Sequence, residues 1–278
     1  MHTPGNRIEG SSDPGRPERS SDGHPRGRGT PLERRARHRR SGEDAPVGLL
    51  VIDKPAGMSS MTAVSIVRRK IGCKAGHAGT LDPLATGVLV VAVGRATKSI
   101  DRFMDTRKVY RTEIDLSAFT ATDDREGEPE EVRVAEPPTT QDVARALETH
   151  FLGEFLQTPP DFSAKKVDGR RAYAVARKGE APKLEPRTVR VHRIELEAYE
   201  WPLATVEVEC DKGFYVRSLA RELGGVLGTG GHCASIRRLA VGPFGLDGSF
   251  DPDDLPDPMP DELLTPLPEA LERLVSRS

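Results

Sequence analysis

Cysteine is scarce in this sequence, as are aromatic residues and long apolar runs. The three cysteines, Cys73, Cys210 and Cys233, stand singly with no CxxC pair. An odd and sparse count argues against a disulfide framework or a zinc knuckle and fits a reducing cytoplasm. The purest apolar run, Val88 to Val93, is much shorter than the roughly 20 residues of a membrane-spanning helix. No apolar stretch follows the basic residues near the N-terminus, so we expect neither a signal peptide nor a membrane span.

Motifs of nucleotide and metal enzymes are missing too. The chain has no GxxxxGKS/T loop and no GxGxxG, so neither nucleotide hydrolysis nor dinucleotide binding has support. It has no HExxH and no close cluster of His and Asp residues. The sequence therefore gives no indication of a metal site or of a nucleotide-binding site.

Charge is unevenly distributed, although the net charge of the 278 residues is only -2. Residues 1–46 hold ten arginines against seven Asp and Glu, about +3, with much Gly, Pro and Ser. Such a segment buries too little apolar surface to offset its ordering entropy. We expect a disordered arm, either a solvated tail or an electrostatic aid to RNA binding. Residues 250–278 hold eight Asp and Glu against two Arg, about -6, and are expected to form an acidic, proline-rich tail with a short helix near 268–275.

The middle of the chain, residues 47–249, is predicted to be one folded domain of the α+β class. Strands and helices alternate without a regular βαβ rhythm, which favours a mixed sheet flanked by helices over a doubly wound nucleotide-binding fold. Strands are predicted at 48–53, 88–93, 108–116, 193–201 and 204–210, and helices at 60–71, 140–151 and 217–227. Apolar residues at helical spacing predict the inward faces of these helices: Met61, Val64, Val67 and Ile71; Val143, Leu147 and Phe151; and Leu219, Leu223 and Val226.

A predicted loop over residues 76–87 carries the most conspicuous polar residue. It is dense in Gly and Thr and holds one carboxylate, Asp82, followed by Pro83. Glycine permits close approach of another chain, and proline stiffens the loop and helps to fix the direction of the carboxylate. Taken alone, however, Asp-Pro in a loop is most often turn chemistry. His77 alone is likewise more often a packed or hydrogen-bonded loop residue.

Three further polar features stand out. Arg217 follows a strand break at Gly213, where it pairs with a buried carboxylate or lies on the surface. Tyr110 falls in a predicted strand, where core packing is the commoner role. Basic residues with an interleaved tyrosine, between 165 and 178, suit an RNA backbone and its bases or a solvated loop.

Read together, several segments carry a specific pattern. They are GLLVIDKPAGMSS, GHAGTLDPLATGVLVVAVGRATK, KVYR, the stretch 157–179, and CDKGFYVRSLARELG with HCASIRRL. These segments resemble the TruB family of bacterial tRNA pseudouridine synthases over about residues 47–242. The GHAGTLDPLATG segment is highly specific to this family and its dyskerin-like relatives, and the flanking sequence favours the stand-alone bacterial branch.

The resemblance implies a pseudouridine-synthase fold with a mainly antiparallel mixed sheet. It also implies an isomerase that converts a uridine of the tRNA T loop, nucleotide 55 in tRNA numbering, into pseudouridine without a cofactor or metal. Asp82 matches the catalytic aspartate of the family, and Arg217 matches the arginine that pairs with it. Tyr110 matches the tyrosine that stacks on the target base, and its hydroxyl is a candidate for moving the C5 proton.

The same resemblance places three residues against the substrate. The target base is stacked in tRNA and must be flipped out, at a cost of a few kcal/mol. Tyr215 and Ile236 match pocket positions near the base, although Leu is commoner at the second. His77 matches a residue that contacts the T loop where the target base has left.

The resemblance also implies RNA contacts outside the pocket. Residues 159–187, approximately, match the insertion with which the family grips the T arm. We expect Lys165, Lys166 and Arg170 of this insertion to contact RNA, together with Lys54 at the end of the first strand.

One departure and two rival functions remain. The residues after 250 are too few for the RNA-binding PUA domain that often ends this family, so no full PUA domain is expected. The rivals are a tRNA-folding chaperone and a guide-RNA-dependent, dyskerin-like subunit. The resemblance implies an enzyme whose partner is tRNA and which requires no other protein. We expect a monomer because no exposed apolar stripe is evident in the sequence, and a cytoplasmic location because the cysteine count fits a reducing compartment.

Overall fold

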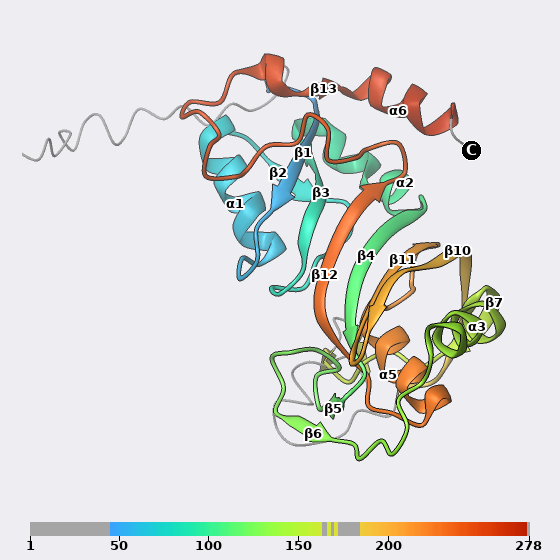
Figure 1. Cartoon of the computed structure of the whole chain (residues 1–278). Helices are drawn as coiled ribbons and strands as arrows, with labels where there is room; N and C mark the ends of the chain where they lie inside the picture. Colours follow the sequence, from blue (N-terminus) through green and yellow to red (C-terminus); the bar gives the residue numbers. More distant parts are fainter. Residues whose placement is uncertain (1–44, 163–165, 168–169, 172–183, 277–278) are drawn as a thin grey trace, which may run out of the picture. The chain divides into compact units, whose positions relative to one another are not determined.

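A computed structural model describes residues 45–162, 166–167, 170–171 and 184–276 of the chain (Figure 1). The arm expected at residues 1–46 therefore lies outside the described residues up to residue 44. So does most of the insertion expected at about 159–187, apart from its two ends and the two-residue strands β8 and β9.

One large sheet organises the described residues, with the strand order β13-β1-β3-β12-β4-β11-β10-β7 and β2 attached to β3. Its strand pairs are antiparallel except for β3 with β12, which confirms the predicted mixed, mainly antiparallel α+β fold. The sheet strands are β1 (Gly48–Lys54), β2 (Ala75–His77), β3 (Thr86–Val93), β4 (Lys108–Asp115), β7 (Gly153–Gln157), β10 (Arg187–Glu200), β11 (Leu203–Cys210), β12 (His232–Val241) and β13 (Thr265–Pro266). Two small hairpins pair β5 (Ala118–Thr120) with β6 (Pro129–Glu131) and β8 (Lys166–Val167) with β9 (Arg170–Arg171).

Helices cover both faces of this sheet (Figure 1). The α-helices are α1 (Ser60–Ile71), α2 (Ile100–Met104), α3 (Thr140–Phe151), α5 (Val216–Leu227) and α6 (Leu267–Val275), with 3-10 turns at Gly94–Ser99 and Asp261–Leu263. Residues of α1, α3 and α5 share the larger hydrophobic core, whereas residues of α2 and α6 share the smaller one. Strand β3 contributes to both cores with alternate residues, which explains why its apolar run is continuous.

Helix α1 begins and ends where local signals place it. The Ser59 side chain accepts a hydrogen bond from the Thr62 amide, and Gly72 closes the helix at φ 77°, as is usual for a left-handed C-cap. The predicted inward face is confirmed except for Met61, which is 56% exposed. The buried stripe includes Ser60 instead, so Met61 falls off that stripe in the first turn.

The other predicted helices are confirmed with one similar correction. Helix α3 starts with a capping box between Thr139 and Asp142 and buries the predicted apolar stripe. In α5, Leu219 and Leu223 are buried, but Val226 is 44% exposed, and the buried face continues through Gly224 instead.

The strands and their bounds were predicted less completely than the helices. The expected loop 76–87 overlaps two strands, because β2 pairs with the far end of β3 and β3 itself starts at Thr86. Strand β10 begins six residues before the predicted 193, and β12 was not predicted at all. These strands are defined by partners distant in the sequence, so their own residues carry a weak signal.

Residues 250–278, expected as an acidic tail, pack on the body as far as residue 276. Strand β13 pairs with β1, and Leu255, Met259 and Leu264 join the larger core. The Lys70 ammonium group, at the end of α1, donates to three backbone carbonyls of this segment. The segment therefore stabilises the edge of the sheet at β1.

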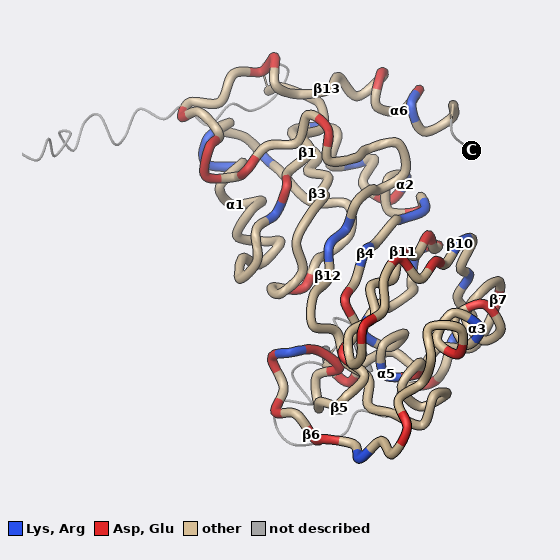
Figure 2. The backbone as a smooth tube through the Cα atoms, in the orientation of Figure 1, with Lys and Arg blue, Asp and Glu red and all other residues tan. Residues whose placement is uncertain are grey.

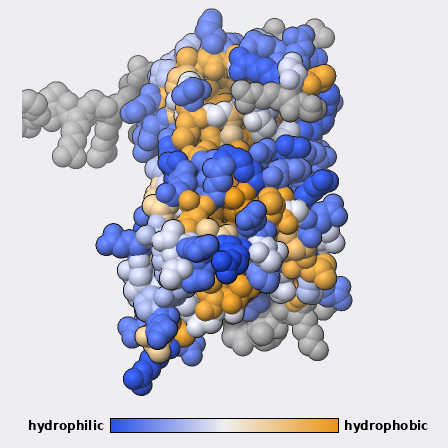
Figure 3. Space-filling view, turned by 45° about the vertical axis from the view of Figure 1, so that its right-hand side comes forward, coloured by the Kyte–Doolittle hydropathy of each residue, from blue (hydrophilic) through white to orange (hydrophobic). Residues whose placement is uncertain are grey.

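Several large hydrophobic side chains are exposed among the described residues. Figure 3 shows apolar patches separated by hydrophilic side chains on one side of the molecule. The large hydrophobic residues that are exposed are Met61, Met104, Leu152, Leu156, Leu203, Val226 and Val275. Within the described ranges, no helix is both long and apolar enough to cross a membrane.

Candidate active site

The loop that carries Asp82 is fixed on both sides of the carboxylate. Leu81 exchanges two hydrogen bonds with the Ser60 hydroxyl of α1, which donates to its carbonyl at 2.9 Å and accepts from its amide at 2.8 Å. The carbonyl of Pro83 accepts from the Gly57 amide at 2.8 Å. The Asp82 side chain itself stays 41% exposed. The backbone is thus held while the carboxylate faces solvent.

Lys54, expected as an RNA contact, is buried and points under this loop instead. Its side chain is fully enclosed, and its ammonium group donates to the carbonyls of Pro55, Met58 and Pro83 at 2.8, 2.7 and 3.3 Å. The expectation of a direct RNA contact is therefore wrong. A lysine next to a turn is normally exposed, but here the turn carbonyls converge on it and satisfy its three donors.

Burial lowers the pKa of Lys54 from 10.5 to about 8, and the Asp82 charge opposes this only in part. The unfolded chain then binds more protons than the folded one between pH 8 and 10.5, so this residue makes the protein more stable as the pH rises through that window. We expect wild type to gain about 1–2 kcal/mol relative to Lys54→Met between pH 7.5 and 9.5. Urea denaturation of both proteins at several pH values measures this gain. Parallel curves would contradict the prediction.

Arg217 lies against Asp82 from the opposite side of the pocket. Its side chain is only 5% exposed, and its Nη2 lies 2.8 Å from Asp82 Oδ2. The same guanidinium donates to the carbonyls of Thr122 at 2.9 Å and Phe162 at 3.0 Å, and its Nη1 lies 3.6 Å from Asp124 Oδ2. A planar, always charged group with several partners holds one orientation, so it fixes and stabilises the Asp82 carboxylate.

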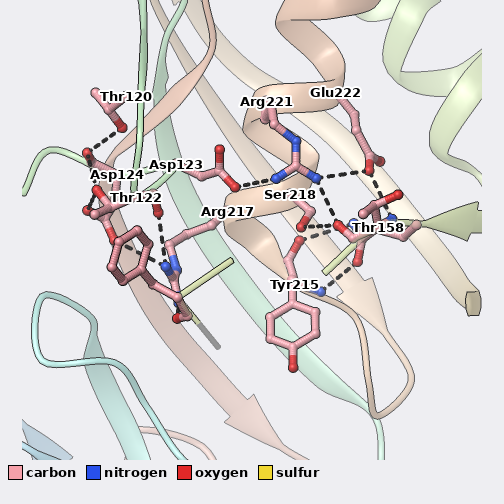
Figure 4. Close-up of polar contacts among 12 residues, drawn as sticks. Thr120, Thr122, Asp123, Asp124, Thr158, Tyr215, Arg217, Ser218, Arg221 and Glu222 are labelled. Atoms are coloured by element: carbon pink, nitrogen blue, oxygen red, sulfur yellow. Dashed lines mark hydrogen bonds and ion pairs between the residues drawn. The ribbon is translucent and has the colours of Figure 1, made fainter. Parts of the chain in front are cut away.

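Helix α5 joins this arginine to a second layer of polar contacts (Figure 4). One turn after Arg217, Arg221 pairs with Asp123 and donates to the Thr158 carbonyl at 2.8 Å. Ser218 donates to the same carbonyl at 2.7 Å. Burial raises the pKa of Asp123 to about 6, with Arg221 opposing the shift. The helix thereby fixes both the turn before β6 and the chain that leads out of β7.

A pocket of about 350 Å³ opens in front of Asp82. Predicted site residues that line it are Asp82, Tyr110, Tyr215, Arg217 and Ile236. Burial raises the pKa of Tyr110, so its hydroxyl keeps its proton at neutral pH. The Tyr215 ring points away from the polar network in Figure 4. The pocket thus combines one carboxylate, one guanidinium and apolar or aromatic walls.

Arg187, at the end of the insertion expected at about 159–187, also lines the pocket, although it was not singled out as a site residue. Its guanidinium carbon lies 4.8 Å from the centre of the Tyr215 ring, within cation–π range. Its Nη2 donates to the Gly213 carbonyl at 2.7 Å, while its buried Nε has no hydrogen-bond partner among the described residues. Its guanidinium therefore adds a positive charge to the pocket lining.

His77 is not among the residues that line this pocket. It lies in β2, opposite Val91 of β3, and its Nδ1 is buried without a hydrogen-bond partner in the described part. Burial, and secondly the Arg238 charge, lowers the pKa of His77. A neutral imidazole is suited to stacking on a base rather than to binding a phosphate.

The sequence of residues 66–216 matches the model of the TruB family pseudouridylate synthases (N terminal domain). The chain belongs to the TruB family. It is 43% identical over 237 residues to the tRNA pseudouridine synthase B of Syntrophobacter fumaroxidans, covering 84% of this chain and 77% of that protein. It is 47% identical over 232 residues to the same-named protein of Gluconacetobacter diazotrophicus, covering 81% and 75%.

Solved structures agree with a pseudouridine-synthase fold. A chain in the crystal structure of a Cbf5-Nop10-Gar1 complex superposes with a TM-score of 0.61 at 26% identity, covering 81% of this chain and 62% of that one. A chain of the archaeal box H/ACA sRNP Nop10-Cbf5 complex superposes with a TM-score of 0.55 at 27% identity, covering 74% and 52%.

For this TruB-family chain, the remaining predicted contacts fall in the insertion. Lys165 lies outside the described residues. Lys166 and Arg170 have described backbones in β8 and β9, but their side chains lie outside the described part. Within the described ranges, no group of three or more His, Cys, Asp or Glu residues is placed to hold a metal ion.

Several site residues were missed: Lys108 and Arg238, which line the pocket, and Asp123, Asp124 and Arg221, which support it. Two adjacent acidic residues in a turn were the only signal for Asp123 and Asp124. Nothing local distinguishes the two lining cations from surface residues.

Proposed function

We propose that this protein converts a uridine of tRNA into pseudouridine, and that the uridine is nucleotide 55 of the T loop. The observation that carries the assignment is the Asp82–Arg217 ion pair at the wall of an aromatic-lined pocket in a TruB-family chain. The family relationship supports the reaction and the tRNA substrate. The residue roles given below are our proposal.

The reaction breaks the N1–C1′ bond, turns the base and joins its C5 to C1′. In our proposal, the Asp82 carboxylate adds to C1′ or stabilises positive charge on the ribose. Arg217 keeps that carboxylate ionised and aimed. Tyr110 stacks on the uracil, and its hydroxyl is placed to receive the C5 proton directly or through water. Neither a cofactor nor a metal is needed for these steps.

The pocket is suited to one nucleotide that has left its stack. Its volume of about 350 Å³ is at the lower end of small-ligand sites, too small for a stacked duplex. A flipped base gains contacts with Tyr110 and the Ile236 side chain, and the Arg187 charge is available to a phosphate. These contacts offset the cost of unstacking.

We expect RNA contacts outside this pocket as well. We propose that the insertion at about 159–187, including Lys165, Lys166 and Arg170, contacts the T arm, and that His77 stacks in the space that the base leaves. The Arg-rich arm, residues 1–46, adds sequence-independent affinity. We further propose a monomer that works in the cytoplasm, where its tRNA substrate is found.

The two rival functions are not favoured. A pure chaperone needs no carboxylate held against a buried arginine, whereas this pocket is built around one. A guide-dependent subunit is disfavoured because identity to chains named tRNA pseudouridine synthase B exceeds identity to the Cbf5 chains.

Tritium release tests the assignment. The purified protein is mixed with a tRNA transcript tritiated at uridine C5, beside a transcript whose nucleotide 55 is cytidine. Formation of the C5–C1′ bond expels the C5 hydrogen, so we expect about one tritium per tRNA from the first transcript and none from the second. No release from either transcript, with binding intact, would favour the rivals. Equal release from both would refute position 55.

A further inference from the structure

Two buried cations form part of the pocket wall without any carboxylate partner. Lys108 is 6% exposed and Arg238 is 1% exposed, and both line the pocket that contains Asp82. In the part of the chain that the structure describes, neither forms an ion pair. Buried charges are normally paired, because an uncompensated one is costly. This exception therefore needs an explanation.

The partners of these two residues are backbone carbonyls and, for Arg238, the Tyr110 hydroxyl as well. The Lys108 ammonium donates to the carbonyls of Met104 and Thr106. Arg238 donates through Nε to the Val88 carbonyl at 2.7 Å and through Nη2 to the Gly79 carbonyl at 3.1 Å. The two carbonyls that bind Arg238 precede and follow Asp82 in the sequence. Carbonyls satisfy the donors of the two cations without forming an ion pair, and the Asp105 and Asp211 charges offset that of Lys108 only in part.

The sheet places both charges beside the tyrosine. Arg238 of β12 stands directly opposite Tyr110 of β4, and Lys108 precedes Tyr110 by two residues on the same strand. Residues two apart, and residues directly opposite, point to the same face of a sheet. Figure 2 shows basic residues on both of these central strands. The cations are therefore adjacent to the ring on which we expect the base to stack.

The proposed reaction creates an anion at this place. When the N1–C1′ bond breaks, both of its electrons stay with the uracil, which becomes an anion with its charge spread over N1, O2 and O4. The C1′ carbon is taken up by the Asp82 carboxylate. The anion then bonds through C5 to C1′, the carboxylate leaves, and the C5 proton is transferred so that N1 ends with a proton. No other reactant is consumed.

We propose that Lys108 and Arg238 form the electrostatic site that stabilises the detached uracil anion while it turns. The inference rests on the proposed function. Fixed charges in a water-poor pocket stabilise developing charge far more than they would in water. The Arg238 charge also repels that of Lys108: burial, and secondly Arg238, lower the pKa of Lys108 to about 8, with the Asp105 and Asp211 charges opposing the shift. The negative charge of the detached uracil offsets that repulsion. The two cations therefore stabilise the detached base more than they stabilise the intact nucleotide.

Two tRNA substrates separate this role from simple positioning. One carries uridine at the target position and the other 5-fluorouridine, whose electron-withdrawing fluorine stabilises the detached base. Single-turnover loss of the target nucleotide is followed at saturating enzyme by nuclease digestion and chromatography, at pH 6.5. The variants are Lys108→Gln and Arg238→Gln, with the charge-keeping Arg238→Lys. Lys70→Gln is the matched control, because Lys70 also binds three backbone carbonyls but does not line the pocket.

For each Gln variant we expect a loss of about 10²-fold or more on uridine and at least tenfold less loss on 5-fluorouridine. Arg238→Lys should retain more of the uridine rate than Arg238→Gln, and Lys70→Gln should treat the two substrates alike. Equal losses on both substrates would overturn the proposal and leave these residues as positioning groups. Circular dichroism and tRNA binding identify any variant that fails to fold, and Arg238→Lys then decides by the same substrate comparison. If wild type consumes neither substrate, the proposed function itself fails.

Discussion

Replacing Asp82 with Asn is expected to abolish pseudouridine formation while leaving tRNA binding within about twofold of wild type. The amide has nearly the same shape, but it carries no charge to stabilise the ribose and is a poor nucleophile for C1′. We expect the single-turnover rate to fall by at least about 10³-fold, which is about 4 kcal/mol of barrier. Tritium release at saturating enzyme measures the rate, and filter binding measures the affinity.

The structure explains why this variant should remain folded. The loop is held by its backbone, through Leu81 and Pro83, and not by the carboxylate. Arg217 also keeps the Thr122 and Phe162 carbonyls as acceptors. Asp101→Asn, on the exposed surface of α2, is the matched control and should behave as wild type. Substantial activity in Asp82→Asn would remove Asp82 from the chemistry and the Asp82–Arg217 pair from the argument for function.

Elements whose signals are local could be predicted from the sequence. Helices α1 and α3 have their caps and apolar stripes within about twelve residues, and the structure confirms both. Strand β12 has no such signal, because it is defined by pairing with β3 and β4, more than 100 residues away. The start of β10 was placed too late because its first residues pair with β7 and not with the neighbouring β11.

The residues of the site likewise divide into those with a recognisable sequence motif and those placed by tertiary contacts alone. Asp82, Tyr110 and Arg217 could be indicated through motifs, and the structure places all three in one pocket. Lys54 was misplaced because a charged residue beside a turn is normally solvated, and its convergence with three carbonyls is a tertiary feature. Lys108 and Arg238 were missed for the same reason: strand residues of positive charge give no sign that they face inward.

The hydrogen bonds and ion pairs of two arginines on α5 show how segments far apart in the chain position the Asp82 carboxylate. Arg217 on α5 joins the Asp82 loop to the turn at Thr122 and to the start of the insertion at Phe162. Arg221, one turn later, holds Asp123 and Thr158, the neighbours of those same two segments. The helix thus organises the pocket with two arginines, of which only the first contacts the Asp82 carboxylate.

Because only Arg217 contacts Asp82, we expect an Arg-to-Lys substitution to lower the reaction rate more at position 217 than at position 221. Arg217→Lys keeps the positive charge, but a single ammonium on a flexible stem cannot hold Asp82 and two backbone carbonyls in one plane. We expect its single-turnover rate to fall by about 10²-fold or more, with tRNA affinity unchanged, because a misaimed carboxylate affects the chemical step. Arg221→Lys should lose less than about tenfold, since its side chain is 29% exposed and pairs with Asp123 rather than with Asp82.

Both rates are measured by tritium release at saturating enzyme, beside urea denaturation to compare stability. Equal losses in the two variants, with equal stability, would mean that α5 acts as a packing unit and that the Arg217–Asp82 contact has no special role. A large loss confined to Arg217→Lys would instead establish that the orientation of the carboxylate, and not merely a nearby positive charge, limits the isomerisation.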